Sequence, residues 1–289
     1  MQVDPAAAVR RFLPEIIDGA VAANPCAPVL ATCLACLQHL LGDSSAANAR
    51  RALQSMYPAF RAAYAVVALH GGDAAQAAAL RALWGAACAL KLAVAAVAAE
   101  AGSSDAVRGA AVRFLEQAVL LLTAELVPAV PGISPAPTPL PPGNAVISKA
   151  ALVRDAEAAL AQLVALLKQQ LNEQSTAPLV TPAVRAAGGI AQQRPQFIGR
   201  LLPPLLALAG CKAVKAAADG AAAGGGAAGG AAAMATALRA ALLMLARSAA
   251  PAAKPWQKKI AAALEGLGAG AELQPQADGR YAGQGGGHP

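Results

Sequence analysis

The chain has 289 residues, of which 57% are hydrophobic but only 3% aromatic. Alanine supplies much of the apolar content, and alanine favours helix. Runs of β-branched and aromatic residues that form strands are absent, which excludes a β fold. We therefore expect helices that pack through many contacts of small area. The net charge of +7 comes without the Lys/Arg block and interleaved aromatic residues that grip nucleic acid, so direct RNA binding is not expected.

A membrane-spanning helix is not expected, although the mean hydropathy is +0.47. The long uncharged runs are 126–148, which prolines interrupt, and 220–238, which is almost wholly glycine and alanine. Neither is the large aliphatic stretch that crosses a bilayer. The first residues also lack an apolar signal region, so we expect an intracellular protein.

Helical segments begin near the N-terminus. In 3–22, Asp4 precedes the pair Val9-Arg10, and apolar residues then recur at helical spacing. In HEAT repeats an acidic residue commonly precedes a Val-Arg pair that opens the second helix. We therefore expect 3–22 to be a second helix, with the first repeat incomplete. Arginines occupy five positions of this Val-Arg type: Arg10, Arg50, Arg108, Arg185 and Arg239.

Further helices follow at 28–41, 46–69, 80–97, 107–122 and 150–171. Pro58 lies inside the second of these and is expected to kink it, because proline removes one backbone hydrogen bond. Between the last two, residues 127–144 carry seven prolines. Such a stretch is neither helix nor central strand, so we expect a long loop that leaves the solenoid.

Residues 181–209 predict two helices joined by a very tight turn. Thr181 is a good N-cap, and Pro195 should end the first helix. Gly188 and Gly189 indicate close helix–helix contact, and Arg194 is placed to cap the last carbonyls of its own helix. The pair Pro203-Pro204 should kink or split the second helix.

The remaining sequence predicts a flexible Gly/Ala-rich loop at 211–230, helices at 232–248 and 251–267, and a disordered tail at 268–289. One such helix pair cannot bury its apolar face alone, so the pattern implies stacked neighbours. The fold class is therefore all-α, a HEAT/armadillo-type α-solenoid of antiparallel helix pairs, with a single domain over 1–267.

The sequence offers no set of residues for catalysis, a cofactor or a metal. His39, His70 and His288 have no carboxylate or cysteine at the spacing of a dyad. Cys33 and Cys36 form one CxxC pair, but neither a second pair nor a spaced histidine pair completes a zinc site. We interpret the cysteines as small helix residues and expect a protein that is not an enzyme.

Three segments, 43–64, 105–122 and 189–197, resemble a known family, and the last is the most specific. The run Gly189-Ile190-Ala191-Gln192-Gln193-Arg194-Pro195-Gln196-Phe197 is similar to the "IARQRPxF" run in the N-terminal HEAT-repeat domain of the symplekin family. Residues 105–122 resemble that family's helix with "IRTHAIKF", which reads Val107-Arg108-Gly109-Ala110-Ala111-Val112-Arg113-Phe114 here.

The resemblance implies a nuclear, non-catalytic scaffold of pre-mRNA 3′-end cleavage and polyadenylation. Its partners would be cleavage and polyadenylation factor subunits and the phosphatase of the RNA polymerase II C-terminal domain, bound on the concave helical face. The basic position of the "IRTHAIKF" run corresponds to Arg113. Arg108 and Arg61 are weaker candidates from their helix faces. The alternative is a generic HEAT/armadillo adaptor for transport or assembly, unrelated to mRNA processing.

Overall fold

The computed structural model describes residues 5–124, 140–173, 179–222, 229–248 and 250–273. Within these ranges the chain forms helices and turns and no strand. Most of the predicted proline-rich loop (127–139), part of the Gly/Ala-rich loop (223–228) and most of the predicted tail (274–289) lie outside the described residues.

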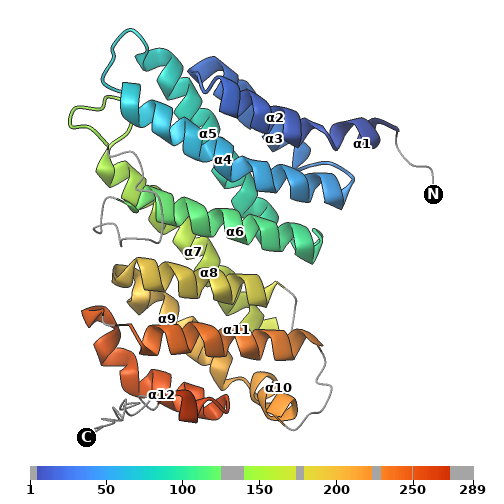
Figure 1. The fold of residues 1–289 in the computed structure, drawn as a ribbon, viewed down its shortest axis with the longest axis vertical. Helices are drawn as coiled ribbons and strands as arrows, with labels where there is room; N and C mark the ends of the chain where they lie inside the picture. The colour runs from blue at the N-terminus through green and yellow to red at the C-terminus, as the bar shows by residue number, and fades with distance from the viewer. Residues whose placement is uncertain (1–4, 125–139, 174–178, 223–228, 249, 274–289) are drawn as a thin grey trace, which may run out of the picture.

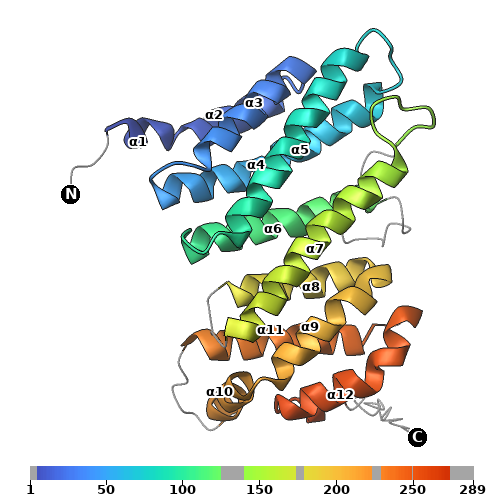
Figure 2. The same cartoon turned by 180° about the vertical axis from the view of Figure 1, so that it is seen from behind.

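The helices stack in two layers, as the solenoid prediction requires (Figures 1 and 2). The front layer in Figure 1 holds α2 (Leu13–Ala23), α4 (Ala46–His70), α6 (Asp105–Leu122), α8 (Val180–Gln193) and α11 (Gly229–Ala246). The layer behind holds α3 (Ala27–Leu40), α5 (Ala77–Ala99), α7 (Lys149–Glu173), α9 (Ile198–Gly210) and α12 (Gln257–Gly266). Shorter elements are α1 (Pro5–Arg10), α10 (Lys212–Ala222), and the 3-10 helices η2 (Pro195–Phe197), η3 (Pro251–Trp256) and η4 (Gly270–Leu273).

The few aromatic residues gather where α4, α5 and α6 meet. The Phe60 ring contacts Phe114 edge-on, with centroids 5.6 Å apart, and Trp84 lies 5.9 Å from Phe60 and 6.3 Å from Tyr64. Phe60, Tyr64 and Phe114 are at most 2% exposed. Elsewhere alanine and leucine fill the interior, so this cluster is the bulkiest part of the core.

Helix α8 fits between α6 and α11 because two of its residues lack side chains. A Cβ on Gly188 would lie 2.8 Å from the Cβ of Ala241 in α11. A Cβ on Gly189 would lie 2.6 Å from Oε1 of Glu116 in α6. The predicted close helix–helix contact at these glycines is confirmed.

Arg194 joins the ends of two helices in the front layer. Its Nη1 donates to the carbonyl of Gln193, so it caps its own helix α8 as predicted. Its Nε donates to the Thr123 hydroxyl at 2.9 Å and its Nη2 to the Leu120 carbonyl at 2.8 Å, both at the end of α6. The sequence did not predict this second function, which fixes α8 against α6.

Asn144 anchors the start of α7 to the end of α4. Its Nδ2 donates to the Val67 carbonyl at 2.8 Å, while its Oδ1 accepts from the N–H groups of Val146 and Ile147. A Cβ on Gly71 would overlap the Asn144 amide. Glycine at 71 therefore allows this contact between repeats.

At the N-terminal end, the single helix predicted over 3–22 is wrong. The chain breaks at Arg11 and Phe12, between α1 and α2, and Pro14 lies in the first turn of α2. The break lets Arg10 donate from Nε to the Asp43 carboxylate at 2.6 Å, in the turn before α4.

The internal prolines do not interrupt their helices. Helix α4 runs through Pro58, and α9 runs through Pro203 and Pro204 to Gly210, so of the predicted kink or split of α9 the split does not occur. Leu201, Leu205 and their apolar neighbours in α9 are buried. This packing holds the helix where local backbone preference alone would break it.

Two predicted boundaries also change. The loop predicted at 211–230 contains α10, whose Val214, Ala217 and Ala218 are buried. It follows α9 at a bend of 69°. The disordered tail predicted from 268 is wrong for 268–273: Gly268 has φ +71°, the Ala269 N–H donates back to the Leu264 carbonyl at 2.8 Å to close the end of α12, and η4 follows.

By length and composition, α5 could cross a membrane, with a mean hydropathy of 1.8. Core helices of soluble proteins satisfy the same criterion, and α5 packs against α3, α4 and α6. It also carries Lys91, whose Nζ lies 3.1 Å from Oδ1 of Asp155 in α7. These contacts support a core helix.

Candidate partner-binding face

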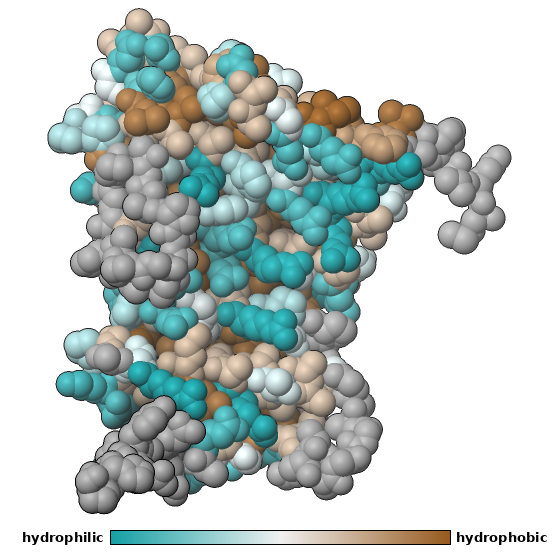
Figure 3. All heavy atoms as spheres, viewed as in Figure 1, coloured by the Kyte–Doolittle hydropathy of each residue, from teal (hydrophilic) through white to brown (hydrophobic). Residues whose placement is uncertain are grey.

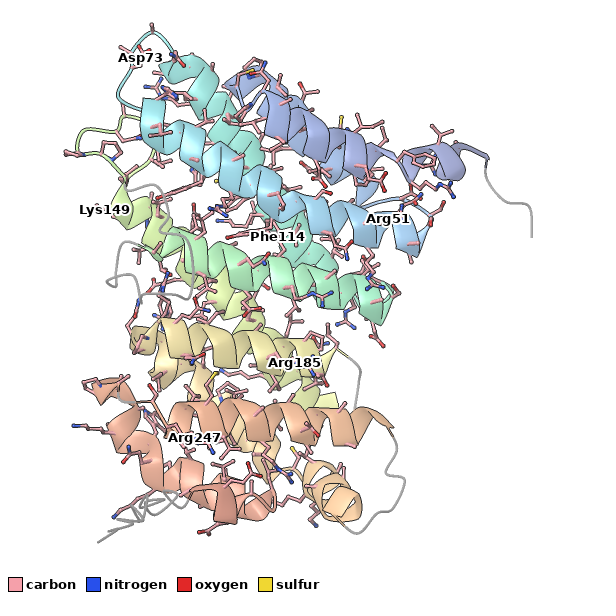
Figure 4. All side chains as sticks on the ribbon, in the orientation of Figure 1. Arg51, Asp73, Phe114, Lys149, Arg185 and Arg247 are labelled. Carbon is pink, nitrogen blue, oxygen red and sulfur yellow. The ribbon has the colours of Figure 1, made fainter. Side chains whose placement is uncertain are left out.

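Arg113, the main predicted contact residue, is exposed on α6 in the front layer. The next residue, Phe114, is buried against Phe60 in the aromatic cluster (Figure 4). The backbone that carries Arg113 rests on the aromatic cluster of the core. The Cα of Arg113 is therefore held at a defined place on the surface of the front layer.

An open hollow of about 410 Å³ lies beside Arg113. It is lined by residues from three helices, here called the arginine hollow: Arg50, Asp105, Ala106, Gly109, Arg113 and Pro182. These residues belong to the first halves of α4, α6 and α8, so the three helices begin at the same edge of the layer. A Cβ on Gly109 would lie 3.2 Å from Cγ of Pro182, so α6 and α8 are in close contact at its floor.

The face around the hollow is basic. Arg50, Arg113 and Arg185 are exposed, and none of them makes an ion pair or hydrogen bond within the part of the chain that the structure describes. By contrast, two other exposed arginines form ion pairs. The Arg51 Nη1 lies 3.6 Å from Oε1 of Glu15, and the Arg200 Nη1 lies 3.4 Å from Oε1 of Glu157. Figure 3 shows hydrophilic side chains gathered over α4, α6 and α8, and Figure 4 shows Arg185 on α8.

Acidic groups on the same face offset only part of this charge. Asp105 lines the arginine hollow. Glu116 lies one turn beyond Arg113, and burial raises the pKa of its carboxyl, while the charge of Arg113 works in the opposite direction. The chemistry available at the face is binding of carboxylates or other anions by guanidinium groups.

Arg108, a weaker candidate, does not belong to this face. It is 7% exposed, and its Nε donates to the Ala98 carbonyl at 3.2 Å. That carbonyl lies in the last turn of α5, where backbone acceptors have no partner within the helix. Arg108 is thus a helix cap between α5 and α6, and its burial removes it from the candidate contact residues.

Arg61, the other weaker candidate, is exposed on α4 but lies outside the arginine hollow. Its charge partly offsets the rise that burial causes in the pKa of Tyr57. Sequence reasoning did not name Arg50 or Arg185 as contact residues. Their Val-Arg-type positions were the available signal, but the same pattern also marks Arg10 and Arg239, which bind within the fold.

Among the described residues, no group of three or more His, Cys, Asp or Glu side chains is placed to hold a metal ion. The cysteines are free thiols, and burial raises the pKa of Cys33 and of Cys88. Raised values favour the protonated, less reactive form of a thiol.

Comparison with known families gives a match over residues 46–276 to the family model described as "Symplekin/PTA1 N-terminal". The chain belongs to the symplekin/PTA1 family. This is the family that the runs 105–122 and 189–197 resemble, and the match decides against an adaptor unrelated to mRNA processing. Membership supports a role as a scaffold in mRNA 3′-end processing. A search of curated proteins found no match.

Proposed function

We propose that this protein is a non-catalytic scaffold of nuclear pre-mRNA 3′-end cleavage and polyadenylation, and that its front layer binds the phosphatase acting on the RNA polymerase II C-terminal domain. The observation that carries the proposal is the position of Arg113. It is exposed beside Arg50 at the arginine hollow, and neither guanidinium has an ion-pair partner within the described chain.

The rigidity of the face supports this function. Arg50, Arg113 and Arg185 come from three neighbouring helices that pack against one another: α6 meets α8 at Gly109 and Pro182, and α4 meets α6 at Phe60 and Phe114. A surface built on packed helices has a backbone that is already ordered before binding. The entropic cost of association is therefore smaller than for a flexible loop. A partner that presents carboxylates at the same spacing would meet a preformed basic surface.

The proposal assigns catalysis to the bound phosphatase and positioning to this chain. It also predicts a partner surface that is acidic where it covers α4, α6 and α8. The other cleavage and polyadenylation factor subunits would attach elsewhere on the solenoid, because the phosphatase would cover the face formed by α4, α6 and α8.

The test is a pull-down of the phosphatase with the 289-residue chain and with Arg113→Glu. Arg81→Glu is the matched control, because Arg81 is an exposed arginine on α5, in the other layer. Circular dichroism should show the same helix content in all three proteins. We expect wild type and Arg81→Glu to retain the phosphatase and Arg113→Glu to lose it. Retention by a folded Arg113→Glu protein would contradict the proposed face.

A further inference from the structure

We propose that a second surface, at the α12 end of the solenoid, binds single-stranded RNA. It consists of Lys254, Trp256, Lys258 and Lys259 and is called the lysine–tryptophan patch here. The patch spans the junction of η3 and α12, at the lower left of Figure 1, whereas the arginine hollow lies on α4, α6 and α8. The inference therefore does not rest on the proposed function.

The patch is built on a fixed support. Ala253 and Ile260 flank it in sequence, and both are fully buried. The three lysines are exposed, and Trp256 is half-buried against the core. The Lys259 Nζ lies 5.1 Å from the centre of the Trp256 ring. The indole is thus held in place with one cation already at its ring.

The charges of the patch are not balanced by acidic neighbours. Between Asp219 and Glu265 the sequence has five basic residues and no acidic one. Lys254 and Lys258 make no ion pair within the described residues. They lie four residues apart across the junction of η3 and α12, so two like charges are close in the sequence. Lys258 and Lys259 also occupy the first turn of α12, where the helix dipole disfavours cations.

Binding of an anion would reduce both the repulsion between the lysines and the unfavourable interaction with the helix dipole. Trp256 indicates which class of anion binds. Lysines contact a phosphate backbone, and an aromatic face stacks a base of any type. A purely acidic protein surface would use the lysines alone, whereas a single-stranded nucleic acid would also contact the exposed part of the Trp256 ring. The composition led us to expect no direct RNA binding, because this short cluster is diluted in a chain with only 13% charged residues.

The test is the affinity of the 289-residue chain for a fluorescent 12-nucleotide oligouridylate, measured by anisotropy from 50 to 200 mM NaCl. Changing Lys254, Lys258 and Lys259 together to Gln should weaken binding at least about 10-fold at low salt. It should also lower the slope of log affinity against log salt by about 2, because each phosphate contact contributes about 0.7. Trp256→Leu should weaken binding about 10-fold and leave the slope unchanged.

The matched control changes Arg81, Arg154 and Lys168 to Gln, which removes the same charge from exposed positions on α5 and α7. It should change the affinity less than about 3-fold. In a Trp84→Phe background, which leaves Trp256 as the sole tryptophan, RNA should quench the fluorescence. The proposal is overturned if wild type does not bind at 50 mM NaCl, if the control loses as much affinity as the patch variant, or if polyglutamate binds more tightly than RNA.

Discussion

The Nε atom of Arg194 donates to the hydroxyl of Thr123 at 2.9 Å, across the gap between the ends of α8 and α6. Thr123 is fully buried, and its hydroxyl in turn donates to the Val119 carbonyl at 2.6 Å. Burial lowers the pKa of Arg194 somewhat, but the group stays charged at every pH of interest. The arginine of the run that identifies the family therefore connects one repeat to the next.

Replacing Arg194 by Lys should lower the free energy of unfolding by about 2 kcal/mol, because a lysine cannot reproduce the two bonds to α6 and leaves buried acceptors unpaired. Urea denaturation measures the change. Arg185→Lys, an exposed position on the same helix, should stay within about 0.5 kcal/mol of wild type. Equal effects of the two substitutions would show that the Arg194 bonds do not stabilise the fold.

The adjacent glycines of α8 should respond differently to alanine. Gly188→Ala places its methyl against the Ala241 Cβ, which cannot move freely, so the free energy of unfolding should fall by about 1–2 kcal/mol. Gly189→Ala meets only the end of the flexible Glu116 side chain, and better helix propensity should keep it within about 1 kcal/mol of wild type. Adding Ala241→Gly should rescue Gly188→Ala. A larger loss at 189 than at 188 would contradict the packing.

The sequence predicts those elements that are determined by neighbouring residues in the chain. It fails for those that are determined by contacts between distant residues. Local signals were sufficient for the α8–η2–α9 turn at Pro195 and for the close approach at Gly188. They failed for α10, because the many glycines and alanines of 211–230 predict a flexible loop, whereas burial of Val214, Ala217 and Ala218 stabilises a helix over Lys212–Ala222. They also failed for Arg108, because its sequence position does not show whether the side chain points to solvent or to the end of α5.

Asp43 should make stability dependent on pH in the acid range. The hydrogen bond from Arg10 lowers the pKa of its carboxyl most, bonds from the Ser45 N–H and the Asn48 amide add to this, and burial opposes it. Because the folded pKa lies below the ordinary value of about 3.9, this contribution is complete above that value and is lost as pH falls through the folded pKa. Asp43→Asn should therefore destabilise at pH 6, and its difference from wild type should shrink at pH 3. Thermal unfolding at the two pH values gives the answer, and an equal difference at both would contradict this assignment.

The Lys91–Asp155 pair between α5 and α7 should be sensitive to loss of one partner. The Lys91 side chain is only 7% exposed, so Asp155→Ala would leave a buried ammonium without its carboxylate and cost about 3 kcal/mol. The double variant Lys91→Met with Asp155→Leu should recover most of that loss, because it removes both charges. Chemical denaturation of the single and double variants tests the pair. Additive losses would show that the two groups do not interact.

The most direct test of the proposed partner-binding face is the affinity of the polymerase C-terminal-domain phosphatase for two double variants. Arg50→Glu with Arg113→Glu reverses both guanidinium charges at the arginine hollow, whereas Arg81→Glu with Arg154→Glu makes the same charge change on α5 and α7. Biolayer interferometry should show at least about a 100-fold loss for the first and less than about a 3-fold change for the second. Similar affinities for both variants would contradict the claim that the face formed by α4, α6 and α8 binds the phosphatase.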